Sequence, residues 1–493
     1  MDSLVFLCAR CILAQRPLPH ILPGLYPVLF QLAFLDGKDL VLRDLVAAWP
    51  VQVLDFQQLV MRRELLGDHP FIDYIEAAIQ AVVAQLWREL EEPGCDFSKR
   101  RLRVLDMTGL PDSLCGRSPD GVTIWSSTKA LAKAFEEVSK HQQEFQRREP
   151  KQHKGPSGAA TAAPQPPGMD VHANLYVRKD SYRILRNALQ TGAASPLRLR
   201  CREFYAENIS ALKIVVLLEC LYLSCLRRVE LWYSNFGLTE LLLILPHLSR
   251  FPELRSLKLL DFSMNMRRLT PDLAIVIRCV ARHLGMLPSL RELSLGSSQL
   301  SGNLRQILCN LQAPLESLEL GYCSLVPDDL AFLSQSFHAP ALKRLDLTGN
   351  DISQGLLEPL RLLLEETSAS LLHLDLSNCH MADSHLAVLL PTLLRCSRLR
   401  FLRLHGNSLS TAAIKDLLQK TLELPDLHLV VYPVPLDCYK EPLPENNLDC
   451  GTDEELLAAA TVEFSQILAN SGRTDLVWTY NPYGHEVLDY FSL

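Results

Sequence analysis

The sequence predicts an α/β fold: a leucine-rich-repeat solenoid of ribonuclease-inhibitor-like horseshoe form, with a helical N-terminal cap region. Three observations predict it. Five segments fit the pattern LxxLxLxx(N/C/S)xL, they start about 28 residues apart, and the residues between them carry apolar side chains at helical spacing. A sustained period of this length is typical of chains that stack one strand and one helix per repeat.

The repeat pattern also predicts how each unit folds. The leucines of LxLxL are expected to point inward from a short strand, and the Asn or Cys at the ninth position to turn the chain and bond buried backbone. A stretch such as residues 385–398 then returns as an amphipathic helix. The full matches are 290–300, 315–325, 342–352, 371–381 and 399–409, with looser matches at 226–236 and 254–264. The unit 254–289 is longer, around 262–272, and such an insertion often marks a binding face.

In chain order, the sequence divides into five parts. Residues 1–98 form a helical N-terminal region, because 25–35, 39–50 and 71–90 have apolar residues at helical spacing. Residues 102–110 and 196–204 look like the first strands of the solenoid, so the Pro/Gly/Ala-rich stretch between them is expected to be a flexible loop. The expected parts are therefore 1–98, 99–146 (first strand and helix), 147–170 (loop), 171–426 (repeats) and 427–493 (C-terminal capping unit).

Composition excludes several functions. A net charge of −7 argues against a nucleic-acid-binding protein. No apolar run is long enough to span a bilayer, and Asp2 and Arg10 do not suit a signal peptide, so no membrane partner is expected. The 14 cysteines are scattered, several within apolar runs, which indicates reduced thiols in the cytosol or nucleus. We expect a cytoplasmic location. No phosphate-binding, dinucleotide-binding, zinc-protease or serine-hydrolase motif occurs, so we expect neither an enzyme nor a cofactor.

The CxxC of Cys8 and Cys11 needs separate consideration. A structural zinc site requires four ligands, and no second pair stands at suitable spacing. A thioredoxin-like pair would follow a strand in a βαβ unit, which is missing here. We therefore expect no metal site and no redox function at this motif.

Several blocks outside the generic repeat resemble the PRAME family of leucine-rich-repeat proteins. These blocks are LYPVLFQLAF (25–34), VLRDLVAAWP (41–50), LRVLDMTGL (102–110), PLESLELGYCSL (314–325), residues 389–410 and VVYPVPLDCYKE (430–441). The resemblance covers nearly the whole chain and implies two functions. The first is a cytoplasmic scaffold that negatively regulates Toll-like-receptor/NF-κB signalling by binding IκB kinase β and disturbing assembly of the kinase core complex. The alternative is a substrate receptor of a cullin-2 ubiquitin ligase that binds through elongins B and C.

The ubiquitin-ligase alternative depends on a short elongin-binding motif, which can be compared with this sequence. Elongin-binding boxes read (S/T/P)LxxxCxxx(A/I/L/V), and Ser3, Leu4, Cys8 and Ile12 match every specified position. On a helix, positions 4, 8 and 12 line one face. Ser3 is a suitable N-cap, and Leu4 is the expected anchor. The same stripe could instead pack on the solenoid as a cap, and the strand-like segment 196–205 misses the box at only one position.

A cullin box, φPxxφxxxφ, should follow an elongin box. Leu22, Pro23, Tyr26 and Phe30 fit it loosely. The register that begins at Leu18 and Pro19 and continues through Leu22 and Tyr26 fits equally well, so both remain open.

Candidate ligand-binding residues of the repeats lie between the inward leucines. They are Lys343, Arg344, Asp346, Arg400, Phe401 and Arg403.

Overall fold

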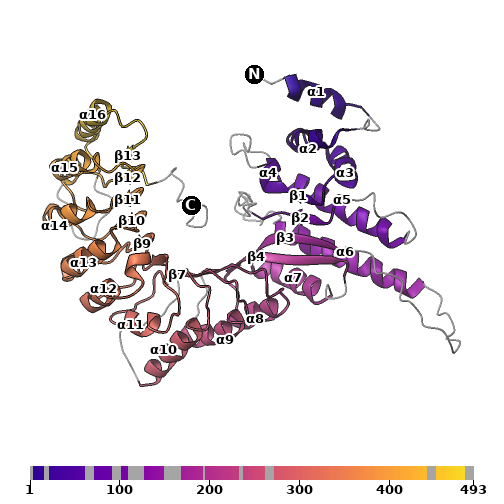
Figure 1. Ribbon diagram of the computed structural model, residues 1–493, viewed down its shortest axis with the longest axis horizontal. Coiled ribbons are helices and arrows are strands. Elements are labelled where there is room, and N and C mark those ends of the chain that lie inside the picture. Colours follow the sequence, from indigo (N-terminus) through magenta and orange to yellow (C-terminus); the bar gives the residue numbers. More distant parts are fainter. Residues whose placement is uncertain are drawn as a thin grey trace. The chain divides into compact units, whose positions relative to one another are not determined.

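The computed structural model describes residues 4–15, 21–60, 71–91, 102–108, 127–148, 168–191, 195–232, 237–260, 271–440 and 451–482. Within these residues, 13 strands join in one parallel sheet, and each strand pairs with the strands before and after it in the sequence. Parallel neighbours separated by helices are the defining feature of the predicted solenoid, so the fold class is confirmed (Figure 1). The chain divides into two compact units, 1–229 and 230–493.

The first unit begins with helices and continues with alternating strands and helices. The helices predicted at 25–35, 39–50 and 71–90 are present as α2, α3 and α5. The helices of this unit are α1 (Leu4–Leu13), η1 (Pro23–Leu25), α2 (Tyr26–Leu35), α3 (Asp39–Ala47), α4 (Phe56–Val60), α5 (Phe71–Glu91), α6 (Ser127–Arg148), α7 (Lys179–Thr191) and α8 (Ala211–Glu219). The strands are β1 (Val53–Asp55), β2 (Val104–Asp106), β3 (Met169–Val177), β4 (Leu197–Glu207) and β5 (Arg228–Trp232), within which the division between the units falls.

The sheet begins earlier than the sequence analysis predicted. Residues 1–98 were expected to be helical, yet β1 lies within them and pairs with β2 residue by residue. Both strands have the sequence VLD, and one buried leucine, Leu54 or Leu105, points inward from each. Asp55 Oδ1 accepts the N–H of Gln57 at 2.9 Å, and Asp106 Oδ1 accepts that of Thr108 at 3.0 Å. The repeated tripeptide was a signal, but three residues are too short for periodicity to reveal a strand.

The Pro/Gly/Ala-rich stretch lies between helix α6 and strand β3. Helix α6 continues to Arg148 and β3 begins at Met169, and β3 pairs directly with β2. The interval between them, most of the predicted loop 147–170, lies outside the described residues, as does most of the insertion at 262–272.

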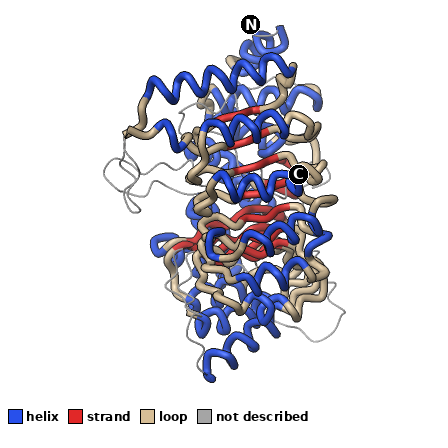
Figure 2. Tube along the Cα trace, turned by 90° about the vertical axis from the view of Figure 1, so that its left-hand side faces the viewer, coloured by secondary structure: helices blue, strands red, loops and turns tan. Residues whose placement is uncertain are grey.

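The second unit repeats a strand followed by a helix. Its strands are β6 (Ser256–Leu260), β7 (Glu292–Ser294), β8 (Ser317–Glu319), β9 (Arg344–Asp346), β10 (His373–Asp375), β11 (Phe401–Arg403), β12 (Leu429–Val431) and β13 (Val477–Thr479). Its helices are α9 (Leu238–Leu248), α10 (Pro271–Leu284), α11 (Leu304–Leu308), α12 (Pro327–Ser334), η6 (Ala339–Ala341), η7 (Ile352–Gln354), α13 (Leu357–Thr367), α14 (Asp383–Leu393), α15 (Thr411–Thr421), η8 (Leu436–Cys438) and α16 (Glu454–Ser471). Figure 1 shows α12 to α15 along one side of β9 to β12, and Figure 2 shows the strands stacked in parallel steps.

The core of the second unit lies between the sheet and these helices. The middle residue of each strand from β7 to β12, and Leu257 of β6, points into it in one continuous row. Every member of the row is fully buried: Leu257, Leu293, Leu318, Leu345, Leu374, Leu402 and Val430. The stacked repeats thus share one apolar core that no single repeat could bury alone.

The ninth repeat position forms the backbone bonds that its Asn or Cys predicted. Asn350 Nδ2 donates to Leu320 O at 2.9 Å, in the preceding repeat. The thiol of Cys379 lies 3.3 Å from Leu347 O, again one repeat earlier. These side chains reach backbone carbonyl groups of the preceding repeat and so join successive repeats.

The residue before the ninth position has a left-handed backbone in five successive repeats. Its φ is 62° at Ser297, 55° at Tyr322, 70° at Gly349, 54° at Asn378 and 70° at Gly406. At Gly349 a Cβ would approach the ring of Tyr322 to 2.3 Å, so both the conformation and the space favour glycine there.

Among the described residues, no helix has both the length and the apolar character required to cross a bilayer.

Candidate interaction surfaces

Helix α1 packs on the first unit through one stripe and leaves a second stripe accessible. Ala9 and Leu13, four residues apart, are buried, and α1 contacts α2. Arg10 Nε lies 3.8 Å from Asp36 Oδ2, just beyond α2. Cys8 is exposed and Ile12 is half-buried. The elongin-box stripe and the packing stripe are therefore different faces of the same helix. Ser3 and the side chain of Leu4 lie outside the described residues.

The accessible side of α1 is apolar and carries free thiols. Leu7 is 49% exposed, and Cys8 and Cys11 are both exposed and unbridged. The part of the chain that the structure describes holds no group of three or more His, Cys, Asp or Glu side chains arranged for a metal ion.

The four cullin-box residues fall into two environments. Leu22 is 66% exposed and Pro23 is exposed as well, where η1 begins. Tyr26 and Phe30 are buried on α2, and the rings of both contact Trp49 edge-to-face at centroid distances of 5.8 and 5.7 Å. These two side chains hold the helices of the first unit together, so a partner could reach only Leu22 and Pro23 in this conformation. Leu18 and Pro19, which open the other register, are not described.

The second unit presents a continuous surface on the side of the sheet opposite the leucine row. Side chains alternate along a strand, so the residues on either side of each inward one point to this side, called here the strand face. Strand register aligns them in two rows. The first row is Ser256, Glu292, Ser317, Arg344, His373, Phe401, Leu429 and Val477; the second is Lys258, Ser294, Glu319, Asp346, Asp375, Arg403, Val431 and Thr479.

At the β6 end, the strand face is a network of paired charges. Lys258 Nζ lies 3.1 Å from Glu292 Oε1 and 3.1 Å from Glu319 Oε1. Arg344 reaches the same Glu319 oxygen at 3.2 Å. Burial alone would raise the pKa of Glu319, but Lys258 and Arg344 outweigh it and lower the pKa. Burial opposes the charge of Lys258 too, yet Glu319 and Glu292 leave its pKa raised. This end of the face is therefore largely self-neutralised.

The middle of the strand face contains groups whose charge is disfavoured. Burial, together with repulsion from Asp375, raises the pKa of Asp346 to about 6. Burial, assisted by the cations of Arg344 and Arg403, lowers the pKa of His373 well below its usual value. His373 is thus a neutral ring at pH 7, and it stacks on Phe401 with 5.7 Å between centroids.

At β11 and β12 the strand face becomes apolar. Phe401, Leu429 and Val431 form one cluster, with exposed fractions of 8%, 7% and 0%. Arg403 lies beside the cluster in the second row, with its Nη1 3.9 Å from Asp375 Oδ2. We call these three residues the apolar end of the strand face.

The structure locates the repeat residues that the sequence analysis nominated. Arg344, Asp346, Phe401 and Arg403 lie on the strand face. Lys343 and Arg400 precede their strands and lie off it, and Lys343 Nζ pairs with Glu316 Oε2 at 2.7 Å. The sequence analysis missed Leu429 and Val431, because it assigned residues from 427 onward to the C-terminal capping unit and did not read a repeat strand there.

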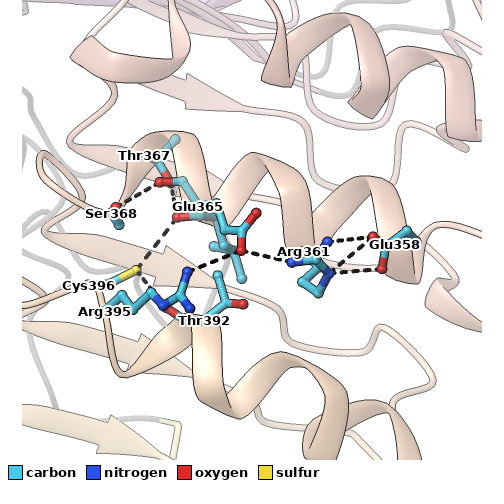
Figure 3. A network of polar contacts seen from close by, with 9 residues as sticks. Glu358, Arg361, Glu365, Thr367, Ser368, Thr392, Arg395 and Cys396 are labelled. Atoms are coloured by element: carbon cyan, nitrogen blue, oxygen red, sulfur yellow. Dashed lines mark hydrogen bonds and ion pairs between the residues drawn. The ribbon is translucent and has the colours of Figure 1, made fainter.

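The helical side of the second unit carries a different polar network, shown in Figure 3. Arg361 of α13 lies between Glu358 and Glu365, at 2.6 and 2.8 Å. Arg395 of the next repeat reaches Glu365 at 3.3 Å. Cys396 beside it is buried, which raises the pKa of its thiol to about 11. Exposed pairs at these spacings are typical of a solvated helix surface.

The chain is similar to several known proteins. The family model "PRAME C-terminal domain" matches residues 190–479. Leucine-rich repeat-containing protein 14 of Xenopus laevis is 42% identical over 509 aligned residues, with all of both chains covered. Human PRAME family member 12 is 31% identical, covering 87% of this chain and 82% of that protein. Among solved structures, a chain of the yeast Rad7–Elc1 complex aligns over 91% of this chain and 97% of its own length, with 13% identity and a TM-score of 0.38.

Proposed function

The chain belongs to the PRAME family of leucine-rich-repeat proteins, and we propose that it is a cytoplasmic, non-enzymatic scaffold with two protein-binding surfaces. The exposed stripe of α1 binds elongin C, as part of an elongin B/C–cullin-2 ubiquitin ligase. The strand face binds a regulated partner, for which the family resemblance suggests IκB kinase β. The proposals for the two surfaces are independent, and each has its own test.

One observation carries the elongin proposal. Helix α1 is held to its own unit through Ala9 and Leu13, while Cys8 remains exposed. A helix that capped the solenoid with its box residues would have buried Cys8 instead. A short helix with an exposed apolar stripe fits the helix-in-groove mode of recognition, and a small residue at its centre allows a partner helix to approach closely.

The proposed cullin contact involves only two of the four residues that match the cullin box. Leu22 and Pro23 are accessible, whereas Tyr26 and Phe30 belong to the aromatic cluster around Trp49. The accessible pair therefore contacts cullin-2, and the buried pair positions it.

The elongin proposal is tested by co-purification of the full-length chain from cells. Cys8→Lys places a charge in the stripe and should reduce the recovered elongins B and C at least tenfold. The matched control is Ala14→Lys, because Ala14 is also exposed but follows the last residue of α1 and is not a box position. Absence of elongins from the wild-type sample, or equal recovery with both variants, would refute the proposal.

The proposal that the chain binds IκB kinase β rests on the family resemblance. It is supported by a relative within that family that is 42% identical and aligns over the full length of both chains. It predicts that purified chain binds purified IκB kinase β and that loss of the chain increases the NF-κB response to a Toll-like-receptor ligand. Arg344→Ala, on the strand face, should weaken binding, whereas Lys343→Ala, adjacent but off the face, should not. No binding by the wild-type chain, with an unchanged NF-κB response, would sink this claim and leave the elongin claim standing.

A further inference from the structure

The apolar end of the strand face lies where the rest of the same face is polar. Phe401, Leu429 and Val431 point away from the leucine row, whose members in these two strands are Leu402 and Val430. From β6 to β10 the same two rows hold only polar or charged residues. Yet Val431 is fully buried, although its neighbours across the second row, Arg403 and Thr479, both remain partly exposed. The small exposed fractions of Phe401, Leu429 and Val431 mean that other atoms of the chain already cover this cluster.

The last strand, β13, lies next to β12, and the described chain ends three residues after it. Thr479 is the last residue of β13 and belongs to the second row of the strand face. The backbone N–H of Asn481 donates to Thr479 Oγ1 at 3.1 Å. This bond forms a local turn, so the backbone N–H of Asn481 lies beside a side chain of the strand face.

The residues that follow Pro482 have the composition of such a cover. The segment 483–493, YGHEVLDYFSL, contains Val487, Leu488, Tyr490, Phe491 and Leu493. It also carries two acids, Glu486 and Asp489, which complement Arg403 beside the apolar end. This mixture of aromatic and acidic residues matches the character of the surface.

The distance from β13 to the apolar end is short compared with the extended length of the segment 483–493. Neighbouring strands lie about 4.8 Å apart, so the step from β13 across β12 to β11 is about 10 Å. Eleven extended residues reach about 36 Å. The segment can therefore cross the whole apolar end with length to spare.

We propose that residues 483–493 fold back and dock on the apolar end of the strand face. Phe401, Leu429 and Val431 receive apolar side chains of the segment, and Arg403 pairs with one of its acids. The docking itself does not depend on the identity of any partner.

The test is binding of a fluorescein-labelled synthetic peptide 483–493 to purified full-length chains, followed by fluorescence anisotropy. The wild-type chain should bind the peptide at least tenfold more weakly than a chain with Leu488→Ser and Phe491→Ser, because its own segment occupies the site. A chain with Ser492→Ala is the matched control and should behave like the wild type.

The site is assigned by a second substitution within the Leu488→Ser, Phe491→Ser chain. Adding Leu429→Lys should abolish peptide binding, whereas adding Val388→Lys, on an exposed position of α14, should not. Phe401→Ser is a second face variant, used if circular dichroism shows that Leu429→Lys alters the fold. Equal binding to the wild-type and tail-substituted chains, or binding that persists in a folded face variant, would overturn the proposal. Either result leaves the elongin and kinase claims untouched.

Discussion

The side chain of Asn407 holds two successive repeats together, and its removal should have a large cost. Its Nδ2 donates to Leu404 O at 2.7 Å and to Leu376 O at 2.8 Å. Its Oδ1 accepts the N–H groups of Cys379 and Met381, both at 3.0 Å. The side chain is buried, so Asn407→Ala leaves four buried backbone groups without these partners.

The expected magnitude follows from those four bonds. An unsatisfied buried polar group costs about 1–3 kcal/mol, so four groups at the lower figure cost about 4 kcal/mol. A water molecule in the vacated space can restore part of this. We therefore expect the free energy of unfolding to fall by about 2–4 kcal/mol. With a urea dependence of about 3 kcal/mol per molar, the midpoint should shift by about 1 M.

Urea unfolding followed by circular dichroism measures this shift, and amide hydrogen exchange localises it. The amides of Cys379 and Met381 should exchange faster in Asn407→Ala, because they lose their acceptor. Ser408→Ala is the control, since Ser408 is exposed and its change should cost no more than about 0.5 kcal/mol. A midpoint for Asn407→Ala that moves no further than that of Ser408→Ala would refute the reasoning.

Two further predictions concern ionisation. The pKa of Asp346 is about 6 in the folded chain against 3.8 in the unfolded chain, so the folded state binds more protons between pH 4 and 6 and loses stability as the pH rises through that window. The free energy of unfolding of Asp346→Asn, relative to that of the wild type, should therefore rise by about 1–3 kcal/mol from pH 4 to pH 7, as measured by urea unfolding. A difference between the two chains that does not change with pH would contradict this. Burial raises the pKa of the Cys323 and Cys379 thiols to about 12, so iodoacetamide at pH 8 should label exposed Cys309 in the folded chain but neither of them. Mass spectrometry measures the labelling, all three should react in urea, and equal labelling without urea would contradict the burial argument.

The repeat pattern predicted the features that recur in every unit. The inward leucines and the returning helices follow from positions within one 28-residue unit. The Asn or Cys at the ninth position predicted bonds to buried backbone, and the structure shows that those of Asn350 and Cys379 reach the preceding repeat. The first strand, Val53–Asp55, escaped prediction because it is too short to show a period of its own.

The candidate surfaces could be predicted only in part. The sequence identified α1 and the matching residues Cys8 and Ile12, but both the capping and the docking interpretation fitted them. Burial of Ala9 and Leu13 distinguishes the stripes, and this depends on how α1 sits on α2. Likewise, Tyr26 and Phe30 match the cullin box in the sequence as well as Leu22 does. Only their packing around Trp49 shows that they are buried while Leu22 is accessible.

The sequence by itself determined that the chain is a leucine-rich-repeat solenoid, because the repeat period and the alternation within each strand can be recognised along the chain without knowing which residues meet in space. Only the tertiary structure decided what the strand face is like. Phe401 and Leu429 stand 28 residues apart, and each is one ordinary apolar residue in its own repeat. Parallel pairing of β11 with β12 brings them into register. The apolar end, and the charge network of Lys258 with Glu292 and Glu319, therefore exist only once the repeats have stacked.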